Sequence, residues 1–217
     1  MSSEINTTDQ PRASFIEQAR RAQIIDCAID AIAELGFAQA SLAQIAKRAG
    51  VSTGVILYYF AGKDDLIRAV ISHVFAKGAE LIQPVVNAQP TPRDALVTFI
   101  RASVAFFRDY PNYARSVINI HRSGSAPALS PEAEITVVAD EPRQIGFRSI
   151  FRWGQQTGAF RPFSVDVMAT SIVEALDIIP RNHAANPNLD FDGYADELVE
   201  LFDRATRADP PVKEPTP

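Results

Sequence analysis

The side chains best suited to chemistry lie in one short, basic stretch of the chain. Residues 41–63 contain Lys47, Arg48 and Lys63, with serine, threonine and tyrosine between them and no acidic residue. Ammonium, guanidinium and hydroxyl groups are the donors that bind phosphate oxygens. Residues 190–203 carry six acids and no base, which a solvated helix face would also explain. The charge pattern therefore favours a protein that presents only one end to a polyanion.

Residue combinations typical of enzyme active sites are missing from the sequence. His73, His121 and His183 fall in different expected elements, without a metal-ligand spacing. There is no glycine-rich phosphate loop, and the single cysteine, Cys27, excludes an internal disulfide framework. We therefore expect no enzymatic activity, no metal site and no cofactor.

The composition is that of a folded protein without a membrane segment. Of 217 residues, 47% are hydrophobic and 22% are charged, and the formal net charge is −5. No apolar stretch approaches the roughly 20 residues that span a bilayer, and the polar N-terminus is not a signal peptide. We expect a cytoplasmic protein with no membrane partner.

Apolar periodicity predicts an all-α fold of about nine helices. Ile25, Ile29, Ile32 and Leu35 recur at helical spacing, which predicts a helix from about Pro11 to Leu35. A later helix that follows Asp64 should end or bend near Pro84. Start signals at Thr91-Pro92, Ser130-Pro131 and Ser164 lead us to expect helices at about 92–109, 112–121, 132–157, 165–180 and 191–207.

Two short helices joined by a tight turn are expected within residues 41–60. Ser41 with Gln44 forms a capping box, Gly50 ends the first helix, and Ser52 caps the second. The side that locks the pair together is apolar: Ile45, Ala49, Val51, Ile56 and Tyr59 or Phe60. Such a pair is a helix-turn-helix, whose second helix enters the DNA major groove.

The run from about Gln23 to Val70 closely resembles the DNA-binding domain of TetR/AcrR-type transcriptional regulators. The matching pieces are Ile24-Ile25 through Gly36-Phe37, Ser41-Leu42-x-x-Ile45-Ala46, Ala49-Gly50-Val51-Ser52, Gly54, Tyr58, Phe60 and Lys63-Asp64-x-Leu66. The resemblance implies a helix-turn-helix domain at residues 12–72 and a helical effector-binding and dimerisation domain at 73–207. A flexible arm at 1–11 and a proline-rich disordered tail at 208–217 complete the expected organisation.

The resemblance also implies which residues contact DNA. Thr53 and Val55 are placed for base edges, Gly54 for close backbone approach, and Tyr58 and Lys63 for phosphates. The full expected set is Ser41, Lys47, Arg48, Ser52, Thr53, Gly54, Val55, Leu57, Tyr58, Tyr59 and Lys63. Capping alone also explains Ser41 and Ser52.

The second short helix departs from the family pattern at one position. Leu57 stands where a tyrosine often touches phosphate, so that contact is not carried over. Leu57 could make an apolar groove contact or shield the backbone. Tyr59, in the usual histidine place, is compatible with packing or with a phosphate bond.

Aromatic residues of the middle helices are the candidates for an effector pocket. An apolar cavity with a few polar groups suits a hydrophobic or aromatic small molecule, although the same residues could simply form core. The candidates are Phe99, Ser103, Phe106, Phe107, Tyr110, Tyr113, Val117, His121, Phe147, Ile150 and Trp153.

The last two long helices carry apolar stripes that suit a homodimer interface, or the chain's own core. The candidates are Met168, Ser171, Ile172, Ala175, Leu176, Ile179, Leu198, Leu201 and Phe202. Together these expectations describe a homodimeric repressor that binds a near-palindromic DNA operator through residues 52–59 and is released by a small effector. The alternative is a helical protein-interaction adaptor that has lost DNA binding.

Overall fold

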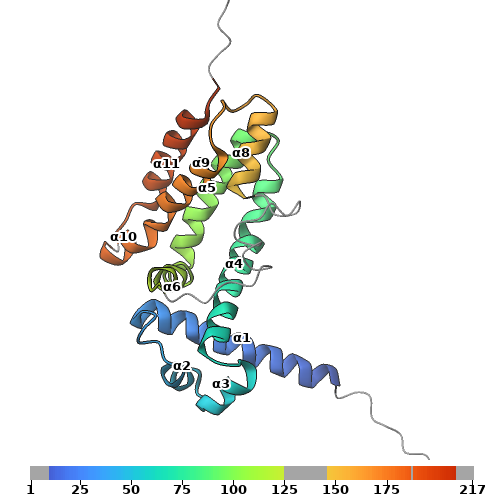
Figure 1. Ribbon diagram of the computed structural model, residues 1–217, viewed down its shortest axis with the longest axis vertical. Coiled ribbons are helices and arrows are strands. Elements are labelled where there is room, and N and C mark those ends of the chain that lie inside the picture. Colours follow the sequence, from blue (N-terminus) through green and yellow to red (C-terminus); the bar gives the residue numbers. More distant parts are fainter. Residues whose placement is uncertain (1–9, 125–145, 187, 209–217) are drawn as a thin grey trace, which may run out of the picture. The chain divides into compact units, whose positions relative to one another are not determined.

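The structure, a computed structural model, describes residues 10–124, 146–186 and 188–208 (Figure 1). These residues are helical, and their only extended pairing is an isolated bridge between Phe160 and Arg207. The helices are α1 (Gln10–Leu35), α2 (Leu42–Ala49), α3 (Thr53–Tyr59), α4 (Lys63–Asn87), α5 (Pro92–Asp109), α6 (Pro111–Arg122), α8 (Phe147–Gln156), α9 (Val165–Asp177), α10 (Ile179–Ala185) and α11 (Phe191–Thr206). The all-α prediction is confirmed.

The expected start signals cap the helices. The Oγ atoms of Ser41 and Ser52 accept hydrogen bonds from the backbone N–H groups of Gln44 and Val55, at 3.2 and 3.3 Å. Thr91 and Ser164 cap α5 and α9 in the same way. These bonds satisfy backbone donors that a helix start would otherwise leave without a partner. Ser130-Pro131 and the first half of the helix expected at 132–157 lie outside the described residues.

Two proline positions behave differently from each other. The helix expected at 165–180 is two helices, because Pro180 stands in the first turn of α10 and has no N–H to donate back to α9. In contrast, α4 continues past Pro84 and ends at Asn87, within one turn of the predicted end.

The chain divides into two compact units. The first unit contains the described residues up to Val74 together with 115–124, and the second contains 75–114 together with 146–208. The C-terminal part of α6 therefore packs with the first unit, while the domain bounds expected from the sequence stay a prediction. There, the Asn119 Nδ2 donates to the Ile32 carbonyl oxygen of α1 at 3.0 Å.

The first unit holds the helix-turn-helix. In it, α1 packs against α2, and α2 against α3. Its core consists of aliphatic side chains and one phenylalanine, all fully buried: Ile24, Ile29, Ile32, Ile45, Ile56, Phe60, Leu66 and Ile67. Burial of such side chains stabilises α2 and α3 far more than their intrinsic helix propensity does. Isolated helices shorter than about 12 residues are only marginally stable in water.

The second unit is built around α5, which packs against α8, α9, α10 and α11. Ile100 of α5, Phe151 of α8 and Ile172 of α9 are fully buried there. No helix of the described residues is long and apolar enough to cross a membrane.

Candidate nucleic-acid interface

The turn between α2 and α3 has the geometry of a helix-turn-helix. Gly50 lies in the left-handed region at φ 67°, and its N–H and that of Val51 bond back to carbonyls of α2. A β-carbon is disfavoured at this backbone angle, which explains the glycine. Ile45 and Ala49 of α2 and Ile56 of α3 are buried between the helices. The pair is thus fixed by apolar contact on one side.

The opposite side of α3 faces solvent. Gly54 is exposed, Leu57 is 51% exposed and Tyr58 is 73% exposed. Thr53 and Val55 are half-buried. The surface that would enter a groove therefore consists of a glycine backbone flanked by leucine, tyrosine and the edges of Thr53 and Val55.

Tyr58 has two neighbours that the sequence motif does not include. Its ring meets that of Tyr59 edge to face, with centroids 5.0 Å apart. Its hydroxyl donates to the Glu17 Oε1 of α1 at 3.4 Å, a long and weak hydrogen bond. Tyr59 is half-buried, which is compatible with the packing role left open for it.

Lys63, expected to bind phosphate, is held within the first unit. Its Nζ donates to the Phe37 carbonyl oxygen at 2.9 Å and lies 4.4 Å from the Phe37 ring centroid. This cation–π contact and hydrogen bond tie the start of α4 to the loop after α1. An ammonium group has three donors, so Lys63 can still offer a hydrogen bond to a phosphate.

Arg48 is likewise paired with α1. Its guanidinium forms two hydrogen bonds with the Glu34 carboxylate, one of them 2.9 Å long, and approaches Asp30 at 3.9 Å. The hydrogen bond from Arg48, and then the charges of Arg48 and Arg115, lower the pKa of Glu34. The same bond raises the pKa of Arg48. Lys47, one residue earlier, is exposed.

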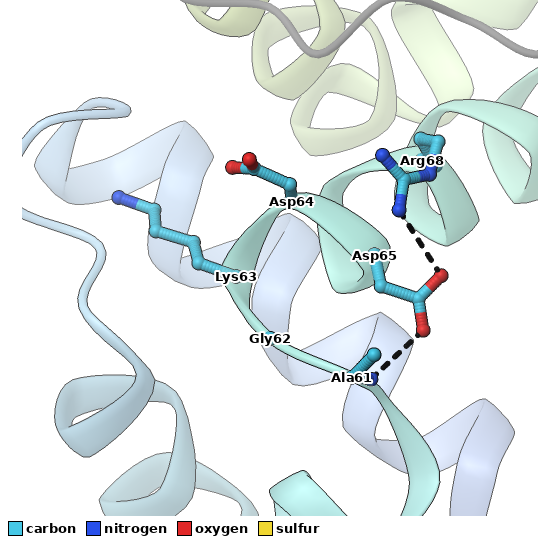
Figure 2. Close-up of a pocket in the computed structure, with 6 residues that line it drawn as sticks. All are labelled: Ala61, Gly62, Lys63, Asp64, Asp65 and Arg68. Carbon is cyan, nitrogen blue, oxygen red and sulfur yellow. Dashed lines mark hydrogen bonds and ion pairs between the residues drawn. The ribbon is translucent and has the colours of Figure 1, made fainter.

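A shallow hollow lies where α4 begins (Figure 2). Its lining is Ala61, Gly62, Lys63, Asp64, Asp65 and Arg68. Asp65 accepts a hydrogen bond from the Ala61 N–H at 3.0 Å and forms an ion pair with Arg68 at 3.6 Å. The Lys63 side chain points away from Asp65 and Arg68 (Figure 2). Because two carboxylates offset the two cations, the hollow is not an electropositive pocket.

The expected effector residues fall into separate groups. Phe99 stacks on Phe147 with centroids 4.2 Å apart, and Phe106 contacts both Phe107 and Tyr110, all within the second unit. Tyr113 meets Tyr110 edge to face, and Trp153 is half-buried. Ser103, Phe106, Phe147 and Ile150 are buried. Val117 and His121 belong to the first unit, and His121 is exposed.

The expected dimer residues are mostly core. Ile172, Leu176, Ile179, Leu198 and Phe202 are buried within the second unit of a single chain. In a single chain these five side chains pack in the core, and their place in a dimer interface stays a prediction. Ser171 is exposed, Leu201 is 58% exposed, and Met168 and Ala175 are half-buried. Val167, which belongs to the same predicted apolar stripe, is 66% exposed on α9.

Several contacts of the interface were not foreseen from sequence. Glu17, Glu34 and Phe37 lie 14–41 positions from the residues that they contact. No local spacing marks such a pair. The opposite charges of Glu34, just before the predicted helix-turn-helix, and of Arg48, within it, were the one available signal.

The sequence comparisons agree with this geometry. Residues 24–70 match the family described as bacterial regulatory proteins, tetR family. The HTH-type transcriptional regulator BetI of Klebsiella pneumoniae is 40% identical over 75 residues, which are 35% of this chain and 38% of that protein. The chain thus matches well under half the length of this curated relative.

Solved structures resemble the fold over most of the chain. The fatty acid degradation regulator FadR from Bacillus halodurans superposes with a TM-score of 0.72 and 22% identity, over 84% of this chain and 97% of that one. FadR from Bacillus subtilis, solved in complex with stearoyl-CoA, gives a TM-score of 0.71 and 22% identity, over 83% and 96%. At this identity the likeness shows a shared fold.

Proposed function

We propose that this chain, which carries the DNA-binding domain of the tetR family, is a ligand-responsive transcriptional regulator. It acts as a homodimeric repressor that binds a near-palindromic operator through α3 and is released by a small, hydrophobic or aromatic effector. The observation that supports DNA binding is that one side of α3 is buried against α2 while the opposite side is exposed to solvent. Ile56 is fully buried against α2, while Gly54, Leu57 and Tyr58 are exposed. A recognition helix needs this combination of a rigid base and an open reading face.

Salt dependence separates DNA binding from the adaptor alternative. Binding of the full chain to a duplex DNA pool should weaken linearly in a plot of log affinity against log salt, because phosphate contacts release condensed cations. Tyr58→Phe should lower the affinity for all duplexes without changing the preferred sequence. A chain that is folded and free of bound ligand, yet binds no duplex at low salt, would support the adaptor.

Homodimerisation supplies the symmetry of the proposed operator. Two identical helix-turn-helix units related by a two-fold axis read two half-sites about one helical turn apart. Exposed Val167 of α9 and Leu201 of α11 are the apolar side chains that a partner subunit would cover.

The effector site is proposed among the aromatic side chains of the second unit. Phe107 and Trp153 are half-buried, so each has surface that a ligand could contact. Phe107→Ala or Trp153→Ala should weaken the response to effector and leave operator affinity intact. Acyl-CoA thioesters are a reasonable first probe, since the Bacillus subtilis FadR of similar fold was solved with stearoyl-CoA. If both variants lose their folded structure, these residues are core.

A further inference from the structure

The N-terminal turns of α1 lie outside the buried core of the first unit. Among the side chains of α1 that the structure describes, the first buried one is that of Ile24, and those of residues 15–21 are all exposed. The turns before Ile24 span about 20 Å at the helical rise of about 1.5 Å per residue. Figure 1 shows them as the dark blue end of α1, which projects past the other helices of its unit. The family match begins only at residue 24.

One face of these turns lies beside the end of α3. Glu17 accepts the hydrogen bond from the Tyr58 hydroxyl. Arg21, one helical turn later, lies with its Cζ 4.9 Å from the centroid of the Phe60 ring. Arg20 shares this face, because residues three and four positions after Glu17 are its neighbours on a helix.

The net positive charge of this face is complementary to a polyanion. Residues 15–23 carry Arg20 and Arg21 against the single acid Glu17. Arg20 is exposed, and its Nη1 donates a local hydrogen bond to the Gln23 Oε1, three residues later on α1, at 2.8 Å. The cation–π contact with the Phe60 ring does not exhaust the five N–H donors of a guanidinium, so the exposed Arg21 can still bind phosphate oxygens.

Tyr58 connects this face to the DNA surface. A phosphate oxygen and a carboxylate oxygen accept the same kind of hydrogen bond, so a phosphate bound by Tyr58 would compete with Glu17 for one hydroxyl. Such a phosphate would lie within two hydrogen-bond lengths, about 6–7 Å, of the Glu17 carboxylate. The N-terminal turns of α1 would then lie beside the DNA backbone, where Glu17 repels and the two arginines attract.

We propose that the N-terminal turns of α1 form a second DNA contact, in which Arg20 and Arg21 bind phosphates of the duplex that α3 reads and Glu17 limits the affinity. This inference rests on the proposed DNA-binding function. It adds a contact outside the residues of the family match, continuous with the exposed face of α3.

The test uses the full chain and a duplex that the unaltered protein selects from a random pool, with flanking base pairs retained. Arg20→Gln combined with Arg21→Gln should weaken binding about ten-fold, and the salt slope should become shallower by about one for each arginine per chain. Glu17→Gln should strengthen binding by about two- to five-fold, because a carboxylate near phosphate is repulsive. Arg204→Gln is the control, since Arg204 is equally long, exposed and located on α11.

Three results would overturn the inference. If the unaltered chain reads its duplex and the double variant keeps the same salt slope, the second contact is wrong and the proposed function stands. If no duplex is bound at all, both fail. Phe15 and Ile16, 72% and 64% exposed on the same turns, provide the third outcome. A change of oligomeric state in Phe15→Ser with Ile16→Ser, without a change of DNA affinity in the arginine variants, would make this surface a contact between copies.

Discussion

Lys63 and Tyr58 are both expected to bind phosphate, but their surroundings differ. The Lys63 ammonium is part-buried and donates to the Phe37 carbonyl oxygen, whereas the Tyr58 side chain is 73% exposed. Lys63 therefore makes a short structural hydrogen bond as well as the proposed DNA contact, whereas Tyr58 makes only a long hydrogen bond to Glu17 and an edge-to-face contact with Tyr59. Substitution of Lys63 should therefore lower both stability and DNA affinity, whereas substitution of Tyr58 should lower DNA affinity alone.

Lys63→Ala should lower the free energy of unfolding by about 1–2 kcal/mol, because a hydrogen bond from a charged group and a cation–π contact are both lost. Tyr58→Phe should leave stability within about 0.5 kcal/mol of the original value, as for most exposed substitutions. Urea denaturation measures both. Equal stability of the two variants would contradict the structural role assigned to Lys63.

Gly154 of α8 has the Phe160 ring against its backbone. A β-carbon built on Gly154 would lie 1.9 Å from the ring, and the Phe160 N–H bonds to the Gly154 carbonyl oxygen, which restricts movement of the ring. Gly154→Ala should therefore lower the free energy of unfolding by about 1–2 kcal/mol, since overpacking outweighs the gain in helix propensity.

The control for this substitution is Gly78→Ala in α4, where the nearest atom would be 4.0 Å away. It should stabilise the protein by up to about 1 kcal/mol through helix propensity. Thermal unfolding of the two variants should move in opposite directions. A stabilised Gly154→Ala variant would show that the ring does not lie on this glycine.

Helices were predictable from sequence where local signals mark them. The caps of α2, α3, α5 and α9 stand at Ser41, Ser52, Thr91 and Ser164, as expected. The break between α9 and α10 was missed although Pro180 marks it, because apolar periodicity continues through it. Burial was harder to assign, since an apolar stripe such as that of α9 has the same spacing whether it faces the chain's own core or a partner.

Long-range pairing is the part that sequence could not supply. Asp203 of α11 accepts a hydrogen bond from the Arg93 Nη2 of α5 at 2.8 Å, across 110 positions, and its other oxygen forms an ion pair with the Arg93 Nε at 2.6 Å. It also pairs with Arg207 at 2.5 Å, and its side chain is only 11% exposed. The acidic run around it was expected as a solvated face, and the neighbouring pair of Asp196 with Arg101 at 2.7 Å is indeed exposed.

Asp203→Ala should lower the free energy of unfolding by about 1–3 kcal/mol, because it removes charged hydrogen bonds that join α11 to α5. Asp196→Ala should change it by less than about 0.5 kcal/mol, as expected for an exposed ion pair. Chemical denaturation of both variants is the measurement. Similar small effects would mean that Asp203 does not hold the two helices together.

At the scale of the whole molecule, the proposed function needs two copies of the chain. Ile172 and Leu176 are buried within a single chain, so we propose exposed side chains such as Val167 and Leu201 for the contact. The division into two compact units fits a DNA-reading part and a sensing part, and α4 and α6 contribute residues to both.

Val167→Glu combined with Leu201→Glu should convert a dimer to a monomer, because the two carboxylates would lose hydration in the interface. Val85→Glu is the control, since Val85 is a comparably exposed valine on α4. Sedimentation velocity gives the oligomeric state, and circular dichroism confirms folding. A folded double variant that remains dimeric would place the interface elsewhere.

The most direct test of the account is selection of random duplex DNA by the purified full chain, followed by sequencing of the bound pool. A dimer that reads DNA through two copies of α3 should enrich a motif with two-fold symmetry and half-sites about one helical turn apart. If a folded dimer stripped of bound ligand enriches no sequence at low salt, DNA recognition by α3 is contradicted. The protein-interaction adaptor would then be the better explanation.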